Sequence, residues 1–315
     1  MVPMTVQRVA ALTTMLLLTA CSPGAPENRA AHTSAASSAL LTSSDSASFR
    51  SAAWRSATGT SAAQSSAERW VPAPDTTWQW QLSGPIDLSF PAKIYDIDGF
   101  ENDAKMVAKL HSLGRKAVCY VEVGSAAKFR PDYRDWPTKL LGKTNGWPGE
   151  RWLDIRDPSK LKPVLAKRFD MCKAKGFDGI EPDLMDGFAN DTGFPLTAAH
   201  QLRFNRFIAQ LAHERGLSVA LKNDVEQVSQ LVGDFDFAVN ESCNVYHECY
   251  LLTPFIKAGK AVLHAEYTLP PSAYCDKSRR LHLSSLRKNT NLDAFAIPCP
   301  TVYAAGTAPG RASGA

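Results

Sequence analysis

Residues 177–187 join a short apolar run to three carboxylates, Glu181, Asp183 and Asp186, with a proline and a glycine turning the backbone. Residues two apart on a strand face the same side, so Glu181 and Asp183 would lie side by side. Their mutual repulsion would cost stability, which favours a functional role for the pair. The alternative is a solvated acidic loop. Similar acids follow later strand-like runs, and this repetition favours an enzyme cleft.

Strand-like runs alternate with helical patterns through most of the chain. The expected strands are residues 77–82, 92–97, 116–123, 177–182, 217–221, 235–240, 260–265 and 292–297. The expected helices are residues 102–113, 159–175, 198–215, 225–232, 251–258 and 277–289. Glycines suited to a left-handed C-cap follow four helical patterns, at Gly114, Gly176, Gly216 and Gly259. Eight strands in one domain predict an α/β fold of the (β/α)8 TIM barrel type, with a doubly wound open sheet as the alternative.

In such a barrel the active residues lie at the carboxyl ends of the strands. The expected strand ends carry Trp80, Tyr95, Asp96, Asp98, Glu122, Glu181, Asp183, Asp186, Lys222, Asn223, Asp224, Asn240, Glu241, Glu266 and Tyr267. Each acid alone could be a structural ion-pair partner. Their common position, within one or two residues of a strand end, predicts an acidic cleft at one rim.

A ring of carboxylates suits glycoside hydrolysis, in which one acid protonates the leaving oxygen and another carboxylate attacks or activates water. Oxygen ligands could also hold a divalent cation. The sequence has no H-E-x-x-H motif, no G-x-S-x-G motif and no phosphate-binding glycine motif after a strand. These absences argue against a zinc hydrolase, a serine hydrolase and a nucleotide-binding enzyme, and we expect no cofactor.

Several motifs at successive strands resemble one family. They are YDIDG at residues 95–99, CYVEVG at 119–124, RWLDI at 151–155, GFDGIEPD at 176–183, LKND at 221–224 and NESC at 240–243. Together they resemble glycoside hydrolase family 114, the endo-α-1,4-polygalactosaminidases, over about residues 75–300. The resemblance implies a (β/α)8 barrel whose catalytic pair is Asp183 and Glu241. One departure is Leu184, which stands where many members have an asparagine.

The resemblance also implies a substrate, a galactosamine polymer that is cationic where it is deacetylated. A cleft lined by Asp98, Glu122, Glu181, Asp224 and Glu266 would attract such a chain. Trp80, Tyr95 and Tyr267 offer flat faces for sugar rings, and Asn223 completes the predicted substrate-binding set. Lys222, a cation among carboxylates, would keep Asp183 ionised as the nucleophile while Glu241 acts as the acid.

The start of the chain resembles a bacterial lipoprotein signal. An apolar run at residues 9–18 follows Arg8 and ends in small residues before Cys21, the expected lipidation site. An ordinary secretory signal is the alternative, and both send the protein out of the cytoplasm, either lipid-anchored or secreted. Residues 22–73 are rich in Ala, Ser and Thr and predict a flexible tether, residues 74–303 the folded domain, and residues 304–315 a tail.

Charge and cysteine content bound the partners. The formal net charge is +4 without a basic block, so we expect no nucleic-acid partner. We also expect a monomer with no membrane contact beyond the lipid anchor. In an exported protein the six cysteines after Cys21 are disulfide candidates. We predict the pairs Cys243–Cys249 and Cys275–Cys299. Cys119 and Cys172 could pair or remain buried thiols.

The leading hypothesis is an exported endo-glycosidase that acts on α-1,4-linked galactosamine polymer with retention of configuration. A carbohydrate-binding lipoprotein that uses the same cleft without turnover is the alternative. An oxygen-ligated metal enzyme is a third hypothesis.

Overall fold

The computed structural model describes residues 69–300, which form one compact unit. The predicted signal with its Cys21, residues 22–68 of the tether and the whole predicted tail lie outside the described residues. Residues 69–73, which the sequence places at the end of the tether, contact the barrel. Arg69 pairs with Asp236 at 3.1 Å, and the Pro72 carbonyl accepts a hydrogen bond from the Ala261 amide at 2.8 Å.

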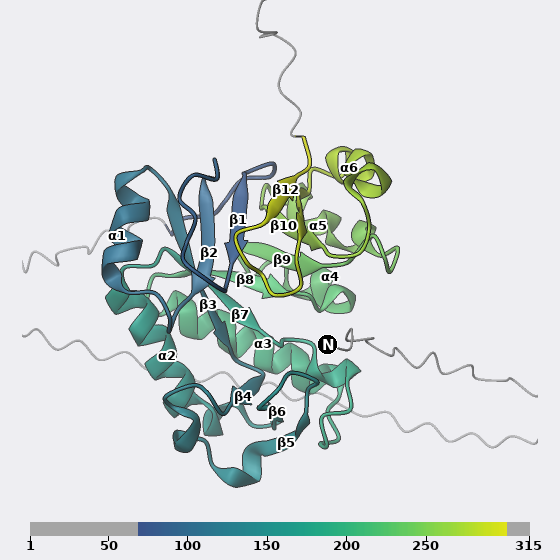
Figure 1. Cartoon of the computed structure of the whole chain (residues 1–315). Coiled ribbons are helices and arrows are strands. Elements are labelled where there is room, and N and C mark those ends of the chain that lie inside the picture. Colours follow the sequence, from purple (N-terminus) through teal and green to yellow (C-terminus); the bar gives the residue numbers. More distant parts are fainter. Residues whose placement is uncertain (1–68, 301–315) are drawn as a thin grey trace, which may run out of the picture. The chain divides into compact units, whose positions relative to one another are not determined.

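Eight parallel strands and one antiparallel strand form a nearly closed barrel, as predicted (Figure 1). The parallel strands are β1 (Trp78–Gln81), β2 (Ile94–Asp98), β3 (Lys116–Glu122), β7 (Gly179–Asp183), β8 (Ser218–Lys222), β9 (Phe237–Glu241), β10 (Val262–Glu266) and β11 (Ser284–Lys288). Strand β12 (Ala296–Pro298) pairs antiparallel with β11. The strands are buried on both faces, which is why most of them read as nearly continuous apolar runs.

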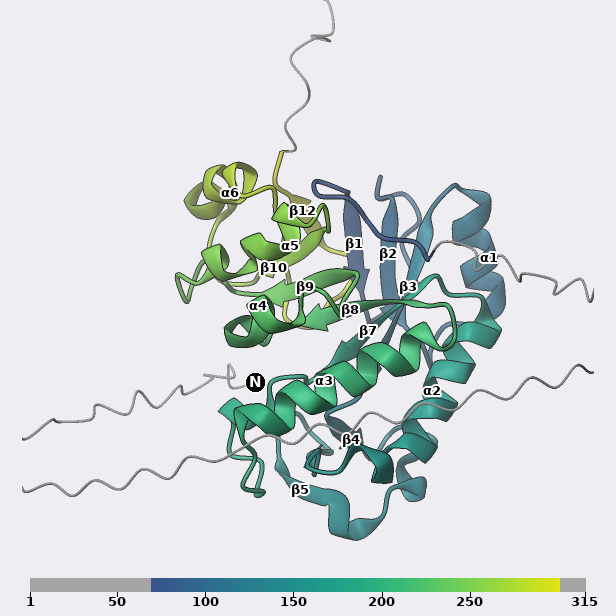
Figure 2. The same cartoon turned by 180° about the vertical axis from the view of Figure 1, so that it is seen from behind.

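Helices follow the strands on the outside of the barrel. They are α1 (Ala104–Ser112), α2 (Lys162–Lys175), α3 (Ala198–His213), α4 (Val228–Leu231), α5 (Thr253–Lys257) and α6 (Pro271–Arg280). Short 3-10 turns occur at Tyr133–Asp135, Thr138–Leu140, Pro158–Lys160, Gly187–Ala189, Val225–Gln227 and Cys249–Leu252. Figure 2 shows α3 crossing the outer side of β7 and β8. No helix among residues 69–300 is long and apolar enough to cross a membrane.

The alternation of side chains along each strand separates two apolar clusters. One cluster fills the barrel interior with residues such as Trp78, Ile94, Val118 and Phe237. The larger cluster packs the outer faces of the strands against the helices. A polar residue one position away from an inward-facing residue therefore points outward, into the helical layer.

The eighth parallel strand is not the predicted one. Residues 277–289 read as a helix and 292–297 as the last strand, whereas α6 ends at Arg280 and the strand is β11. Strand β11 carries two serines and a lysine, so its sequence lacks the apolar run of a buried strand. Two of these polar side chains have internal partners, because the His264 ring lies 2.8 Å from Ser285 Oγ and Lys288 Nζ donates to Gln79 Oε1 at 3.1 Å.

A small antiparallel sheet, also absent from the prediction, is inserted between β3 and α2. It consists of β4 (Ser125–Ala127), β5 (Leu141–Thr144) and β6 (Glu150–Leu153), in the order β4-β6-β5. The chain enters this insertion at the carboxyl end of β3. Because that end belongs to the active face of a barrel, the insertion can supply residues that support the site.

Three disulfides are present among the described residues. Cys243–Cys249 and Cys275–Cys299 confirm the predicted pairs. The third joins Cys119 of β3 to Cys172 of α2, which decides between the two possibilities left open for these residues. It ties an outer helix directly to a barrel strand.

Candidate active site

Lys222, the last residue of β8, places its ammonium among three carboxylates. Its Nζ lies 2.8 Å from Asp183 Oδ1, 2.9 Å from Glu181 Oε1 and 3.3 Å from Glu241 Oε2. The lysine is 2% exposed, and its Nζ lies 4.8 Å from the centroid of the Trp80 ring. Burial lowers the pKa of Lys222, but the three negative charges outweigh it and hold the pKa well above its usual value. The ammonium therefore stays charged and links the two predicted catalytic acids.

Asp183 ends β7 and is held by three donors. Lys222 Nζ and the Leu184 amide each donate to Oδ1 at 2.8 Å, and the Tyr120 hydroxyl donates to Oδ2 at 2.7 Å. Burial raises the pKa of Asp183, but the Lys222 charge and these hydrogen bonds lower it further, so the net shift is downward. This is the ionised, oriented carboxylate that a nucleophile requires.

Glu241 ends β9 and is held from two neighbouring strand ends. Asn223 Nδ2 donates to Oε2 at 3.1 Å, and the Tyr267 hydroxyl donates to Oε1 at 2.5 Å. Asn223 Oδ1 also accepts from the Glu241 amide at 3.0 Å. Asn223 and Tyr267 were predicted to bind substrate, and the structure places them against the predicted general acid.

The sequence model of Glycoside-hydrolase family GH114 matches residues 59–303 of this chain. The chain belongs to this family. It is a glycoside hydrolase, in agreement with the motifs at its strand ends.

The crystal structure of Ega3 from Aspergillus fumigatus, in complex with galactosamine, matches with a TM-score of 0.70 and 36% sequence identity, covering 73% of this chain and 98% of that chain. The glycoside hydrolase domain of PelA from Pseudomonas aeruginosa matches with a TM-score of 0.54 and 15% identity, covering 70% of this chain and 97% of that chain. An uncharacterized protein of Deinococcus radiodurans is 25% identical over 223 residues, which cover 62% of this chain and 71% of that protein.

Two predicted cleft acids of the GH114 chain are instead buried in an ion-pair network. Arg130 donates to Asp98 Oδ2 at 2.6 Å and to Glu122 Oε1 at 2.7 Å. Arg168 donates to the Glu122 carbonyl at 2.6 Å and to Asp132 Oδ2 at 2.7 Å. Asp98 and Glu122 are 4% and 1% exposed, so their charges are used inside the protein. We correct their role from substrate contact to support of the insertion and α2.

Three further predicted contacts face protein rather than substrate. Tyr95 neighbours the inward-facing Asp96 and therefore points outward, where its hydroxyl donates to the Phe90 carbonyl at 2.7 Å. Glu266 also points outward and accepts from the Asn244 amide at 2.8 Å. Trp80 faces inward, and its ring lies against the ammonium of Lys222. Because it is 1% exposed, it offers no open face to a sugar.

The remaining acids of the mouth have raised pKa values. Burial, followed by the charge of Asp183, raises the pKa of Asp186 to about 6. Burial, followed by the charge of Asp186, raises the pKa of Asp224 to about 8, although Asn205 Nδ2 donates to its Oδ2 at 2.7 Å. At neutral pH Asp224 is therefore largely neutral, and Asp186 is the more highly charged of the two.

Sequence reasoning missed Tyr120 and the two arginines of the network. Tyr120 lies within β3 and reads as a core residue, but the register pairs it with Glu181, which places its hydroxyl beside Asp183. Arg130 comes from the unpredicted insertion and Arg168 from α2. No strand-end pattern could point to either.

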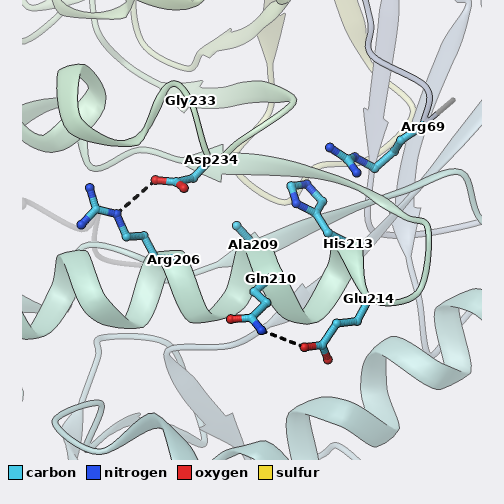
Figure 3. Close-up of a pocket in the computed structure, with 8 residues that line it drawn as sticks. All are labelled: Arg69, Arg206, Ala209, Gln210, His213, Glu214, Gly233 and Asp234. Atoms are coloured by element: carbon cyan, nitrogen blue, oxygen red, sulfur yellow. Dashed lines mark hydrogen bonds and ion pairs between the residues drawn. The ribbon is translucent and has the colours of Figure 1, made fainter. Parts of the chain in front are cut away.

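Other features are not part of this site. Cys243, Cys249 and His264 are close enough to suggest a metal site among the described residues, but the two cysteines share a disulfide and offer no thiolate. A surface hollow of about 420 Å³ lies on α3 and the turn before β9, at the opposite end of the strands (Figure 3). Two of its charged residues, Arg206 and Asp234, pair at 3.1 Å, which fits a stabilising role.

Proposed function

We propose that this GH114 chain is an endo-acting hydrolase that cleaves α-1,4-linked galactosamine polymer with retention, using Asp183 as nucleophile and Glu241 as general acid/base. The observation that carries the proposal is the ammonium of Lys222 shared by both carboxylates, at 2.8 and 3.3 Å. The two contacted oxygens therefore lie within ~6 Å of each other, below the ~6.5–9.5 Å that an intervening water requires for inversion.

The proposed reaction has two steps. Asp183 attacks the anomeric carbon while the bond to the glycosidic oxygen breaks, and Glu241 gives its proton to that oxygen. The Glu241 carboxylate then takes a proton from water, the water oxygen attacks the anomeric carbon, and the carboxylate of Asp183 is released. Tyr120, Asn223 and Tyr267 hold the two acids in position throughout.

The proposed substrate is supported by the relative bound to galactosamine, at 36% identity. The mouth of the barrel also suits an ammonium-bearing chain, because the carboxyl groups of Asp183, Asp186 and Glu241 lie there. A deacetylated polymer would be preferred over a fully acetylated one.

Asp183→Asn and Glu241→Gln test the pair. Each should lower the release of new reducing ends from galactosamine polymer by at least ~100-fold, while Asp276→Asn on the outer helix α6 retains activity. Near-full activity of Asp183→Asn would overturn its assignment. A retained polymer complex without new reducing ends in the wild type would instead favour the carbohydrate-binding alternative.

Proton NMR of the first-formed product tests the stereochemistry. Retention gives an initial α anomer from the α-linked polymer. An initial β anomer would show inversion and remove the nucleophile role from Asp183.

We also propose that the chain is exported, anchored through lipidated Cys21, and monomeric. Labelling of cells with a tagged fatty acid should mark the wild type and not Cys21→Ser. An unlabelled but secreted wild type would support the ordinary secretory signal. Sedimentation of the purified domain tests the monomer.

A further inference from the structure

Asp96 is a buried acid that the proposed mechanism does not use. It lies on β2, faces the barrel interior and is 0% exposed. Glu181, on β7, is also 0% exposed, and β3 lies between their two strands. Side chains from alternate strands meet in one layer inside such barrels, which brings these two acids together.

The two carboxyls contact each other without another donor for Asp96. Taken as ionised carboxylates, both oxygens of Asp96 lack a hydrogen-bond donor among the described residues, and the only charged donor that contacts Glu181 there is the ammonium of Lys222, 2.9 Å from Oε1. Taken as an acid and a carboxylate, a single hydrogen bond joins them. Two buried carboxyl groups within hydrogen-bonding distance of each other cannot both be charged, so one of them carries a proton.

Lys222 decides which of the two carries the proton. Its Nζ lies 2.9 Å from Glu181 Oε1, and this contact favours the ionised form of Glu181. Among the described residues no cation contacts the carboxyl of Asp96. Burial and the charge of Glu181 hold the pKa of Asp96 well above its usual range, despite the opposing effect of Lys222.

We propose that Asp96 is a positioning residue that stays protonated at neutral pH and donates this proton to Glu181, which keeps Glu181 ionised against Lys222. The groups that face Asp96 are Glu181 and Asp183 from β7 and Lys222 from β8. With one proton on this pair, the ammonium of Lys222 is shared between Glu181 on the inner side and the two catalytic acids at the mouth.

The consequence for catalysis depends on the function proposed above. Asp183 must be ionised, but a carboxylate that is stabilised too strongly by a cation is a poor nucleophile, since its charge disappears in the attack. Glu181 shares the positive charge of Lys222 with Asp183, so Lys222 stabilises Asp183 less strongly, and Glu181 holds the ammonium in place. Asp96 makes this possible, because it satisfies Glu181 without adding a second negative charge.

Infrared spectroscopy of the folded protein tests the location of the proton without any assay of activity. The Asp224→Asn/Glu241→Gln double variant serves as background, because Asp224 has a pKa of about 8 and the proposed mechanism places a proton on the general acid Glu241, so each would contribute its own acid band. Slightly above neutral pH, a carboxylic-acid carbonyl band should persist. It should shift when aspartate carboxyls carry carbon-13, stay in place when glutamate carboxyls do, and vanish in Asp96→Asn.

Kinetics test the positioning role. Asp96→Asn is neutral and keeps a donor toward Glu181, whereas Asp96→Leu has a similar size and no donor. We expect kcat of Asp96→Leu to fall ~10- to 100-fold below that of Asp96→Asn, because Glu181 loses the hydrogen bond from position 96 and keeps only its contact with Lys222. The KM values of the two variants should agree, since Asp96 and Glu181 are both 0% exposed and do not touch substrate.

Several results would overturn the proposal. A band that shifts with the glutamate label would place the proton on Glu181, and the absence of a band would mean that Asp96 is ionised. Equal kcat for the Asn and Leu variants would remove the positioning role. If Asp96→Leu does not fold, or the protein hydrolyses no polymer, the infrared result still decides the protonation, so this proposal and the proposed function fail separately.

Discussion

Leu184 has a left-handed backbone, with φ of 65°, directly after Asp183. Asn223 and Asp224 after β8 and Ser242 after β9 are also left-handed. Such a conformation costs a residue like leucine ~1–2 kcal/mol. It persists at Leu184 because the amide donates to Asp183 and the carbonyl packs so closely on Gly124 that a Cβ there would lie 1.8 Å away. Backbone strain thus aims the nucleophile.

Leu184→Asn should relieve part of this strain, because asparagine adopts the left-handed conformation more readily. We expect the free energy of unfolding to rise by ~0.5–1 kcal/mol in urea titrations. Leu113→Asn is the matched control, since Leu113 is also a partly exposed leucine but has φ of −95°. An equal effect at both positions would contradict the role of strain.

Asp224 makes the stability of the protein depend on pH. Its pKa is raised from 3.8 to about 8 in the folded state, so the folded protein binds more protons than the unfolded chain between these values. Its stabilising contribution is complete below about pH 4 and is lost as the pH rises through about 8. At alkaline pH the folded protein therefore contains a buried charge, which lowers its free energy of unfolding.

Asp224→Asn should remove this dependence, because the amide is neutral at every pH and can still accept from Asn205. Relative to the wild type, its free energy of unfolding should be similar near pH 4 and higher by ~1–3 kcal/mol near pH 9. Thermal unfolding across this pH range measures the difference. A difference that does not change with pH would show that Asp224 is ionised in the folded state throughout.

At the scale of elements, apolar runs and the glycines after helices predicted seven of the eight parallel strands to within a few residues. The exception, β11, depends on partners for Ser285 and Lys288 that lie far away in sequence. The inserted sheet has strands of only three or four residues, too short for a periodic signal.

The sequence likewise predicted only part of the candidate site. Position at a strand end located Asp183, Glu241 and Lys222, because the barrel brings all strand ends to one rim. It could not show which neighbours face inward, since that depends on the register between strands. Tyr95 and Glu266 alternate with inward-facing residues and point into the helical layer. Arg130 neutralises Asp98 and Glu122 from a loop that no pattern predicted.

The disulfides differ in the length of chain that each one closes. Cys119–Cys172 closes a separation of 53 residues and Cys243–Cys249 one of 6. From loop-closure entropy, replacing both cysteines of the first pair by alanine should cost about 4 kcal/mol and of the second about 2 kcal/mol. Calorimetry of the two double variants measures this.

Activity should rank the two disulfides in the opposite order. Cys243 lies two residues after Glu241, so its loss should loosen the general acid and lower kcat at temperatures where the variant is folded. Cys119 lies on the outer face of β3, and its loss should mainly affect stability. Unchanged kcat in Cys243→Ala/Cys249→Ala would show that the β9 loop is fixed by other contacts.

At the scale of the whole molecule, the barrel mouth is rich in acidic groups although the net charge of the chain is positive. The chain has 35 Lys and Arg against 31 Asp and Glu, a net charge of +4. The barrel mouth nevertheless gathers Asp183, Asp186 and Glu241 around the ammonium of Lys222. A polycation would therefore be drawn to the mouth despite the positive net charge of the chain.

Salt should separate this long-range attraction from the chemistry at the catalytic pair. The Debye length falls from ~30 Å at 0.01 M to ~8 Å at 0.15 M salt, so added salt screens the approach of the polymer but not contacts of a few ångströms. With deacetylated galactosamine polymer, KM should rise ~3- to 10-fold over this range while kcat changes little. Fully acetylated polymer has no ammonium groups, and its KM should stay constant. Equal salt dependence for both polymers would mean that the acids of the mouth serve the site alone and do not select a cationic substrate.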